Sequence, residues 1–142
     1  YIDGDGQEKQ PFVIHRALIG SFERFFAFLI EHFAGDFPLW IAPDQVTIIP
    51  ISDKHIKYAR EIYDLLNDNG IRVTLDDKTK SMQSKIRDAE KLKIPYLAIV
   101  GDKEIETETV SIRSRLNKEI GLMKKQEFLD YLLEEIRLKK HK

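Results

Sequence analysis

Positive charge is concentrated near the middle of the chain. Residues 78–93 hold six lysine or arginine side chains against Asp88 and Glu90, a local net charge of +4. The whole chain of 142 residues has a formal net charge of -1, so any contact with a polyanion must come from a local patch of this kind. A charge run is usually a solvated helix face, and that interpretation competes here with a phosphate-binding one.

Four further side chains have types that suit chemistry. Arg24 lies early in an apolar stretch, where its forked donors suit phosphate oxygens, although the local sequence alone favours an ion pair with a neighbouring carboxylate. His15 ends a predicted strand, and a lone histidine is more often structural than a metal ligand. Glu104 can accept hydrogen bonds from base amino or imino groups, and Arg113 can pair with a base edge or a phosphate.

The elements that must position these residues begin with a strand and a helix. We predict a short strand over residues 11–15 and a helix from about residue 21 to Phe33, with Gly35 as its stop. The helix has a broad apolar face formed by Phe22, Phe25, Phe26, Leu29, Ile30 and Phe33. Residues 37–43 contain two prolines and are expected to be extended. We therefore place a domain boundary there, between residues 1–38 and 39–142.

The second domain alternates strands and helices. Strands are predicted at residues 46–51, 71–76 and 96–100, and helices at residues 54–68 and from about 81 to 92. A turn at 101–102 precedes a pair of late strands, 109–114 and 119–123, around residues 116–117, and a final amphipathic helix extends to about residue 136. This order predicts an α/β fold with a mixed, mostly parallel sheet, flanking helices and an antiparallel edge. The strand and helix of the first domain precede it.

Composition limits the class of protein. Apolar residues make up 42% and charged residues 33% of the chain, as in a soluble globular protein. Without cysteine, the chain alone can build neither a disulfide nor a cysteine-based zinc site. No apolar run reaches the ~18 to 20 residues needed to span a bilayer, so we expect no membrane contact. The chain opens at Tyr1 in a polar, turn-like segment, which we interpret as the start of a fragment.

The residues around Arg24 carry a recognisable motif. The segment from Ile14 to Phe25, IHRALIGSFERF, closely resembles motif 3 of class II aminoacyl-tRNA synthetases in its threonyl version. Residues 31–35 and 37–43 are similar to that family's exit from the catalytic domain. Five later stretches resemble its anticodon-binding domain in order: PISD at 50–53, NGIRV at 69–73, KIR at 85–87, IPY at 94–96 and GDKE at 101–104. The resemblance covers nearly the whole chain.

The resemblance implies roles for two residues of the first domain. In the family the motif 3 helix carries an arginine that binds ATP, and this role falls on Arg24 as a catalytic residue. The family's zinc site has one Cys and two His, of which the histidine of this motif is the last. His15 is therefore the expected zinc ligand, with its two companions upstream of Tyr1. The implied cofactors of the full-length enzyme are zinc and ATP with magnesium. Glu23 either orients a neighbour or is simply solvated.

The resemblance also implies an anticodon-reading surface. Such surfaces read splayed bases by hydrogen bonds to base edges and hold phosphates with cationic groups. Family contacts map onto Arg87, Lys93, Glu104 and Arg113, with Lys78 and Thr79 in the preceding loop. That loop departs from the family, which often has arginine, asparagine and glycine where this chain has Lys78, Thr79 and Gln83. The departures put the details of base reading by the loop in doubt, although the identity of the domain is unaffected.

The family joins L-threonine to threonine tRNA with ATP, so those three molecules are the implied partners of the full-length enzyme. We expect the fragment to supply mainly anticodon recognition and to be inactive alone. The full-length enzyme is expected to be a cytoplasmic homodimer. The rival interpretation is a non-catalytic tRNA-binding or accessory protein with an anticodon-binding-like domain. That rival predicts loss of the motif 3 arginine and of the zinc histidine, yet Arg24 and His15 are both present.

Overall fold

A computed structural model describes residues 1–115 and 119–140 of the chain. It contains two compact units, residues 1–34 and 35–142, which we describe separately. The domain boundary expected between residues 38 and 39 stays a prediction. No helix of the described residues is long and apolar enough to cross a membrane.

The first unit is built around one helix. Helix α1, Phe22–Phe33, starts at Ser21, whose Oγ accepts a hydrogen bond from the backbone N–H of Arg24 at 3.3 Å. It ends where Ala34 adopts a left-handed conformation with φ 50°. The predicted helix is therefore confirmed. None of its residues is buried, and Phe22 is 72% exposed.

The strand predicted for residues 11–15 is wrong. These residues have neither strand nor bridge structure. The only pairing in this unit that the described residues show is a bridge between Ile2 and Glu8, which closes the turn at residues 3–6. A strand is stabilised by backbone hydrogen bonds to a neighbour. The apolar pattern of residues 11–15 indicated a strand but could not supply that neighbour.

The second unit contains a five-stranded sheet in the order β2-β1-β3-β4-β5. The strands are β1 (Val46–Pro50), β2 (Val73–Leu75), β3 (Tyr96–Val100), β4 (Thr109–Ser114) and β5 (Glu119–Lys124). The helices are η1 (Asp53–His55), α2 (Ile56–Asp68), α3 (Met82–Lys91), α4 (Asp102–Glu106) and α5 (Lys125–Leu138). Strand β1 pairs in parallel with β2 and β3, whereas β3–β4 and β4–β5 are antiparallel. The predicted α/β fold with a mixed sheet and flanking helices is confirmed, with parallel and antiparallel pairs in equal number.

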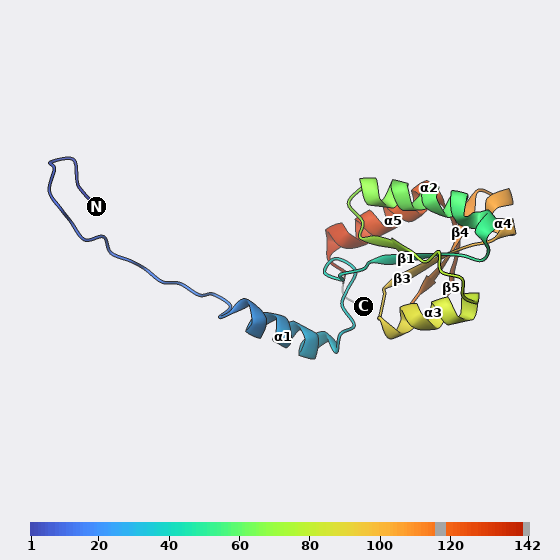
Figure 1. Ribbon diagram of the computed structural model, residues 1–142, viewed down its shortest axis with the longest axis horizontal. Coiled ribbons are helices and arrows are strands. Elements are labelled where there is room, and N and C mark those ends of the chain that lie inside the picture. Colours follow the sequence, from blue (N-terminus) through green and yellow to red (C-terminus); the bar gives the residue numbers. More distant parts are fainter. Residues whose placement is uncertain (116–118, 141–142) are drawn as a thin grey trace. The chain divides into compact units, whose positions relative to one another are not determined.

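Helices cover both faces of the sheet. Figure 1 shows α2 and α5 on one face and α3 on the other. The larger core lies under α2 and α5 and includes Ile48, Ile62 and Phe128, none of which is exposed. The smaller core lies under α3 and includes Ile49, Ile86 and Leu97. Burial on both faces explains why β1 and β3 are buried along their whole length.

One detail differs from the sequence prediction, and a second prediction falls on residues that the structure does not describe. The turn predicted at residues 101–102 is wrong at Asp102, which is the first residue of the short helix α4 (Asp102–Glu106), and the sequence pattern did not indicate that helix. A helix of five residues is too short to leave a periodic apolar pattern. The turn predicted around residues 116–117 lies outside the described residues.

Candidate nucleic-acid interface

Three loops meet at one edge of the sheet. Strands β2, β1 and β3 are parallel neighbours, so their carboxyl ends lie at the same edge. The loop after β1 leads to η1, the loop after β2 leads to α3, and Gly101 joins β3 to α4. The chain leaves β1 toward β2 on one side and returns to β3 on the other. In open α/β sheets, ligands bind at such a topological switch point, where successive connections leave one strand in opposite directions.

A cleft of about 460 Å³ lies between the first two of these loops. Its lining comes from the end of β1 and the turn after it, the starts of η1 and α2, the loop after β2, and α3: Pro50, Ile51, Ser52, Asp53, Ile56, Asp77, Lys78, Thr79, Lys80, Ser81 and Lys85. Lys78 and Thr79, both predicted as site residues, are exposed in this lining. The lining thus presents ammonium and hydroxyl groups, which suit a phosphate, together with the carboxylates of Asp53 and Asp77.

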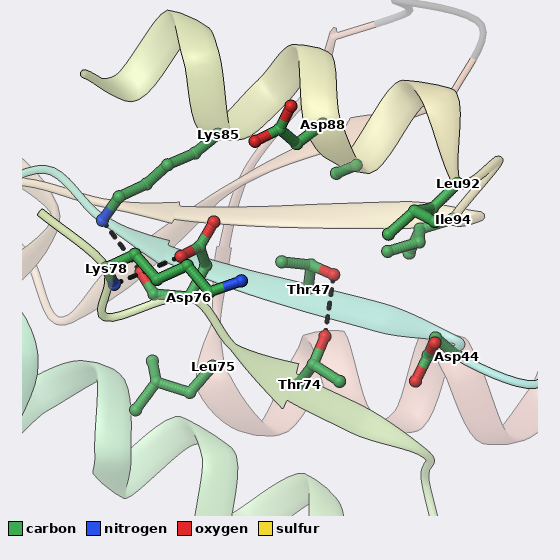
Figure 2. A pocket seen from close by; sticks show the side chains of 11 residues that line it. Asp44, Thr47, Thr74, Leu75, Asp76, Lys78, Lys85, Asp88, Leu92 and Ile94 are labelled. Carbon is green, nitrogen blue, oxygen red and sulfur yellow. Dashed lines mark hydrogen bonds between the residues drawn. The ribbon is translucent and has the colours of Figure 1, made fainter. Parts of the chain in front are cut away.

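Lys85 lines both this cleft and a second, smaller one. The smaller cleft, about 220 Å³, lies beside α3 and is drawn in Figure 2. The Lys85 side chain is only 5% exposed, and its Nζ donates hydrogen bonds to the backbone oxygens of Asp76 (2.8 Å) and Pro50 (3.3 Å). It thereby joins the carboxyl end of β1 to the loop after β2. Lys85 is one of the six cations of residues 78–93, and its burial excludes it from the phosphate-binding surface that this segment was expected to form.

The positive charge of the basic segment is also partly neutralised. Lys80 Nζ lies 2.6 Å from Asp88 Oδ2, so the two side chains form an exposed ion pair. The hydrogen bond between them raises the pKa of Lys80 and lowers the pKa of Asp88. The exposed cations that the segment offers besides Lys80 are Lys78, Arg87, Lys91 and Lys93. The electrostatically most favourable place for a phosphate backbone is therefore along α3 and at its two ends.

Arg113 lies on the same face of the sheet as α3. It pairs with Leu97 of β3, and Leu97 belongs to the small core under that helix. Directly opposed residues of antiparallel strands point to the same face. Lys93 follows α3 in the loop before β3, with a left-handed φ of 56°. Arg113 and Lys93 thus lie toward the amino end of β3, whereas Lys78 and Thr79 lie at the carboxyl edge, with Arg87 exposed on α3 between them.

Glu104 is separate from both groups, on helix α4. Its side chain is half-buried, and its Oε2 accepts a hydrogen bond from the backbone N–H of Gly101 at 2.9 Å. Beside it, Asp102 Oδ1 lies 3.0 Å from Nε2 of His55, whose ring is almost fully buried. This hydrogen bond lowers the pKa of the Asp102 carboxyl. Sequence reasoning missed His55, although both turns that it connects were recognised as motifs.

The two site residues of the first unit are exposed and lie on separate parts of it. His15 belongs to the segment without strand structure, and Arg24 lies in the first turn of α1. Within residues 1–115 and 119–140, no group of three or more His, Cys, Asp or Glu side chains is placed to hold a metal ion. A complete zinc site is therefore not formed by this part of the chain.

Comparisons with known proteins agree with this geometry. Residues 45–135 match the family model described as "Anticodon binding domain". The threonine–tRNA ligase of Aquifex aeolicus (strain VF5) is 46% identical over 139 residues, which cover 98% of this chain and 22% of the relative. That of Clostridioides difficile (strain 630) is 50% identical over 136 residues, covering 96% and 21%. The chain thus spans about a fifth of the length of the curated relatives it matches.

A solved structure extends the likeness to the fold. The RNA-binding domain of threonyl-tRNA synthetase from Cryptosporidium parvum Iowa II superposes with a TM-score of 0.77 at 27% identity, covering 81% of this chain and 29% of that one. Its domain therefore shares the mixed sheet and flanking helices described above. The family model covers the sheet from β1 to β5 and most of α5, including the edge where the three loops meet. The chain belongs to the anticodon-binding domain family.

Proposed function

We propose that this chain is the anticodon-reading part of a threonine–tRNA ligase. The observation that carries the proposal is the extent of the likeness. The match to threonine–tRNA ligases runs over 98% of the chain, beyond the 45–135 stretch of the domain family, and so includes the motif around Arg24.

In this proposal the RNA lies along α3. Three exposed cations follow this helix: Lys78 before it, Arg87 on it and Lys93 after it. They hold successive phosphates of a single-stranded loop. Glu104 accepts hydrogen bonds from a base edge, and Arg113 donates to another. Thr79 lines the cleft with one hydroxyl, so it has one donor, which shares its oxygen with the acceptor, where the family has an amide with separate donor and acceptor groups.

The proposal is tested by a double-mutant cycle in the full-length enzyme. Glu104→Ala and Arg113→Ala are each combined with anticodon substitutions in threonine tRNA, and aminoacylation efficiency is measured. We expect each variant to cost about 1–3 kcal/mol with the cognate anticodon, taking the scale of a good base contact, and less when the anticodon is already altered. Additive losses would show that neither residue reads the anticodon.

The catalytic roles belong to the same proposal. The full-length protein would activate L-threonine with ATP and magnesium and transfer it to threonine tRNA. Arg24 would bind ATP, the role that the resemblance to motif 3 implies, and its guanidinium in the first turn of α1 offers several donors for a phosphate. His15 would contribute one zinc ligand, and further ligands would have to come from outside the described residues. We further propose a cytoplasmic homodimer.

Both catalytic assignments can be measured in the full-length enzyme. Arg24→Ala should reduce pyrophosphate exchange at saturating threonine, since a charged contact to phosphate is lost. His15→Ala should lower zinc content and threonine activation together. Normal exchange in the first variant, or full zinc occupancy by elemental analysis in the second, would contradict the respective role. The alternative, a non-catalytic tRNA-binding or accessory protein, predicts no pyrophosphate exchange even in the wild-type full-length protein.

A further inference from the structure

The carboxylate of Glu104 is held by the backbone of its own turn. Its Oε2 accepts the Gly101 N–H at 2.9 Å, and Gly101 is the residue that joins β3 to α4. Among the hydrogen bonds of the described residues, none involves the other oxygen, Oε1. The side chain therefore has one oxygen fixed to the protein and one available to a ligand. Such a hydrogen bond orients the carboxylate and restricts the rotation of the side chain before binding. Less conformational entropy is then lost when a ligand binds.

A side chain at Gly101 would crowd two neighbouring side chains. A Cβ atom built there would lie 2.7 Å from Cδ1 of Ile51 and 3.0 Å from Oε2 of Glu104. The backbone angles of Gly101, φ -131° and ψ -169°, are open to any residue. A side chain here would therefore have to displace the exposed end of Ile51 and press against Glu104, although the backbone conformation would accept it. One of the two atoms that such a Cβ would crowd is the carboxylate oxygen Oε2 of Glu104.

Helix α4 is also fixed from the turn after β1. The Ser52 N–H lies 3.2 Å from Nδ1 of His55, and a backbone N–H can only donate, so Nδ1 carries no proton in this bond. The proton of the neutral ring is then on Nε2, which donates to Asp102 Oδ1 at 3.0 Å. The ring is 3% exposed and connects the Ser52 backbone to the Asp102 side chain, two groups far apart in sequence. Ser52 and Asp102 are thereby held at a set separation.

We propose that Gly101, Asp102 and His55 are positioning residues for Glu104, which they hold ready for a hydrogen-bond donor on a base of a single-stranded RNA loop. This proposal rests on the proposed function. Helix α4 has only five residues, and so short a helix has little stability of its own. Its direction, and with it the direction of Glu104, therefore depends on the anchors at Gly101 and Asp102.

The test is binding of this chain to the anticodon stem–loop of threonine tRNA and to stem–loops with single anticodon changes. Glu104→Ala is expected to weaken cognate binding by roughly 5- to 150-fold, the equivalent of a good base contact, and to reduce discrimination. Asp102→Ala and Gly101→Ala should reproduce much of that loss. Combined with Glu104→Ala, they should add little, because they act through Glu104. The Asp102 side chain is 85% exposed, so its removal leaves no cavity.

Rescue separates positioning from general stability. His55→Gln should retain discrimination, because the glutamine amide can accept from Ser52 and donate to Asp102, whereas His55→Ala should lose it. Ile62→Val is the control: it alters the buried core under α2 and should lower the unfolding temperature without changing discrimination. The imidazole ¹⁵N shifts of His55 should report a proton on Nε2 and none on Nδ1.

Two outcomes would overturn the proposal, and they differ in what else they refute. If Glu104→Ala loses discrimination while Asp102→Ala and Gly101→Ala keep it, the positioning role is wrong and Glu104 remains a reader. If Glu104→Ala itself leaves discrimination unchanged, Glu104 is not a base reader. The proposed function then loses that residue, and the positioning role falls with it.

Discussion

Lys85 and Lys78 have the same side chain but different surroundings. Lys78 is exposed at the rim of the cleft, whereas the Lys85 ammonium is buried and bound to the backbone oxygens of Pro50 and Asp76. The first can meet an RNA phosphate, and the second holds two loops together. Only one of them therefore belongs to a binding surface.

This difference predicts the effect of Lys85→Met. Methionine fills a similar volume but donates no hydrogen bond, so two backbone oxygens lose their partner. We expect the free energy of unfolding to fall by about 1–3 kcal/mol, the cost of leaving buried polar groups unsatisfied. Urea denaturation measures it. The matched control is Lys91→Met on the exposed side of α3, which should change stability by less than about 0.5 kcal/mol. Equal effects of both variants would show that Lys85 has no structural role.

At this scale the sequence indicated residue types but not their pairings. The motif around residues 101–104 drew attention to Glu104, and the charge run drew attention to Lys80. Neither pattern indicated that Asp88 would neutralise Lys80 or that His55 would bind Asp102. Pairings depend on which turns meet in space, and residues 55 and 102 meet only once β1 and β3 are neighbours. The roles proposed for Arg87 and Lys93 at phosphates, and for Arg113 at a base edge, stay predictions.

Arg115 fastens the start of the second unit to the element that ends at Ser114. Its Nη1 donates to the backbone oxygen of Phe37 at 2.8 Å, and its guanidinium forms an ion pair with Asp36. Burial lowers the pKa of Arg115, and the carboxylate of Asp36 opposes that shift. The segment before β1 is thus held against the end of β4 as well as by its own apolar residues.

We predict that Arg115→Ala destabilises this unit. Hydrogen bonds to a charged group contribute roughly 1.5–3 kcal/mol, and the free energy of unfolding should fall by about that amount. Arg87→Ala, which removes an exposed arginine from α3, is the matched control and should stay within about 0.5 kcal/mol of wild type. Amide hydrogen exchange should also accelerate around residues 36–42 in Arg115→Ala alone. Unchanged exchange there would contradict a fastening role.

Elements with strong patterns were predictable, and those that depend on neighbours were not. The strand at residues 96–100 agrees with its prediction at both ends because it is a short, wholly buried apolar run. Helix α3 was found within a residue at each end, since Ser81 supplies a recognisable N-cap. The strand expected at residues 11–15 failed for want of a partner. Helix α4 was missed because five residues show no period.

The second unit should fold without the first. Its sheet is covered on both faces by its own helices, and both cores are formed within residues 35–142. We expect residues 35–142 alone to unfold in one cooperative transition. Trp40, the only tryptophan, reports it by fluorescence, and circular dichroism should give the same midpoint. A chain of residues 39–142 should be less stable, because it lacks the partners of Arg115. Non-coincident transitions would rule out an independent unit.

The sheet combines two kinds of pairing that differ in when they can form. Strands β4 and β5 are neighbours in sequence and can meet as a hairpin soon after synthesis. Strand β1, in contrast, needs Tyr96–Val100 as its inner partner, with Val46 opposite Tyr96. Such non-local pairing slows folding, since a long loop must close first. On the ribosome the apolar strand β1 therefore waits for β3 to be made. Until then it is a site where nascent chains can aggregate.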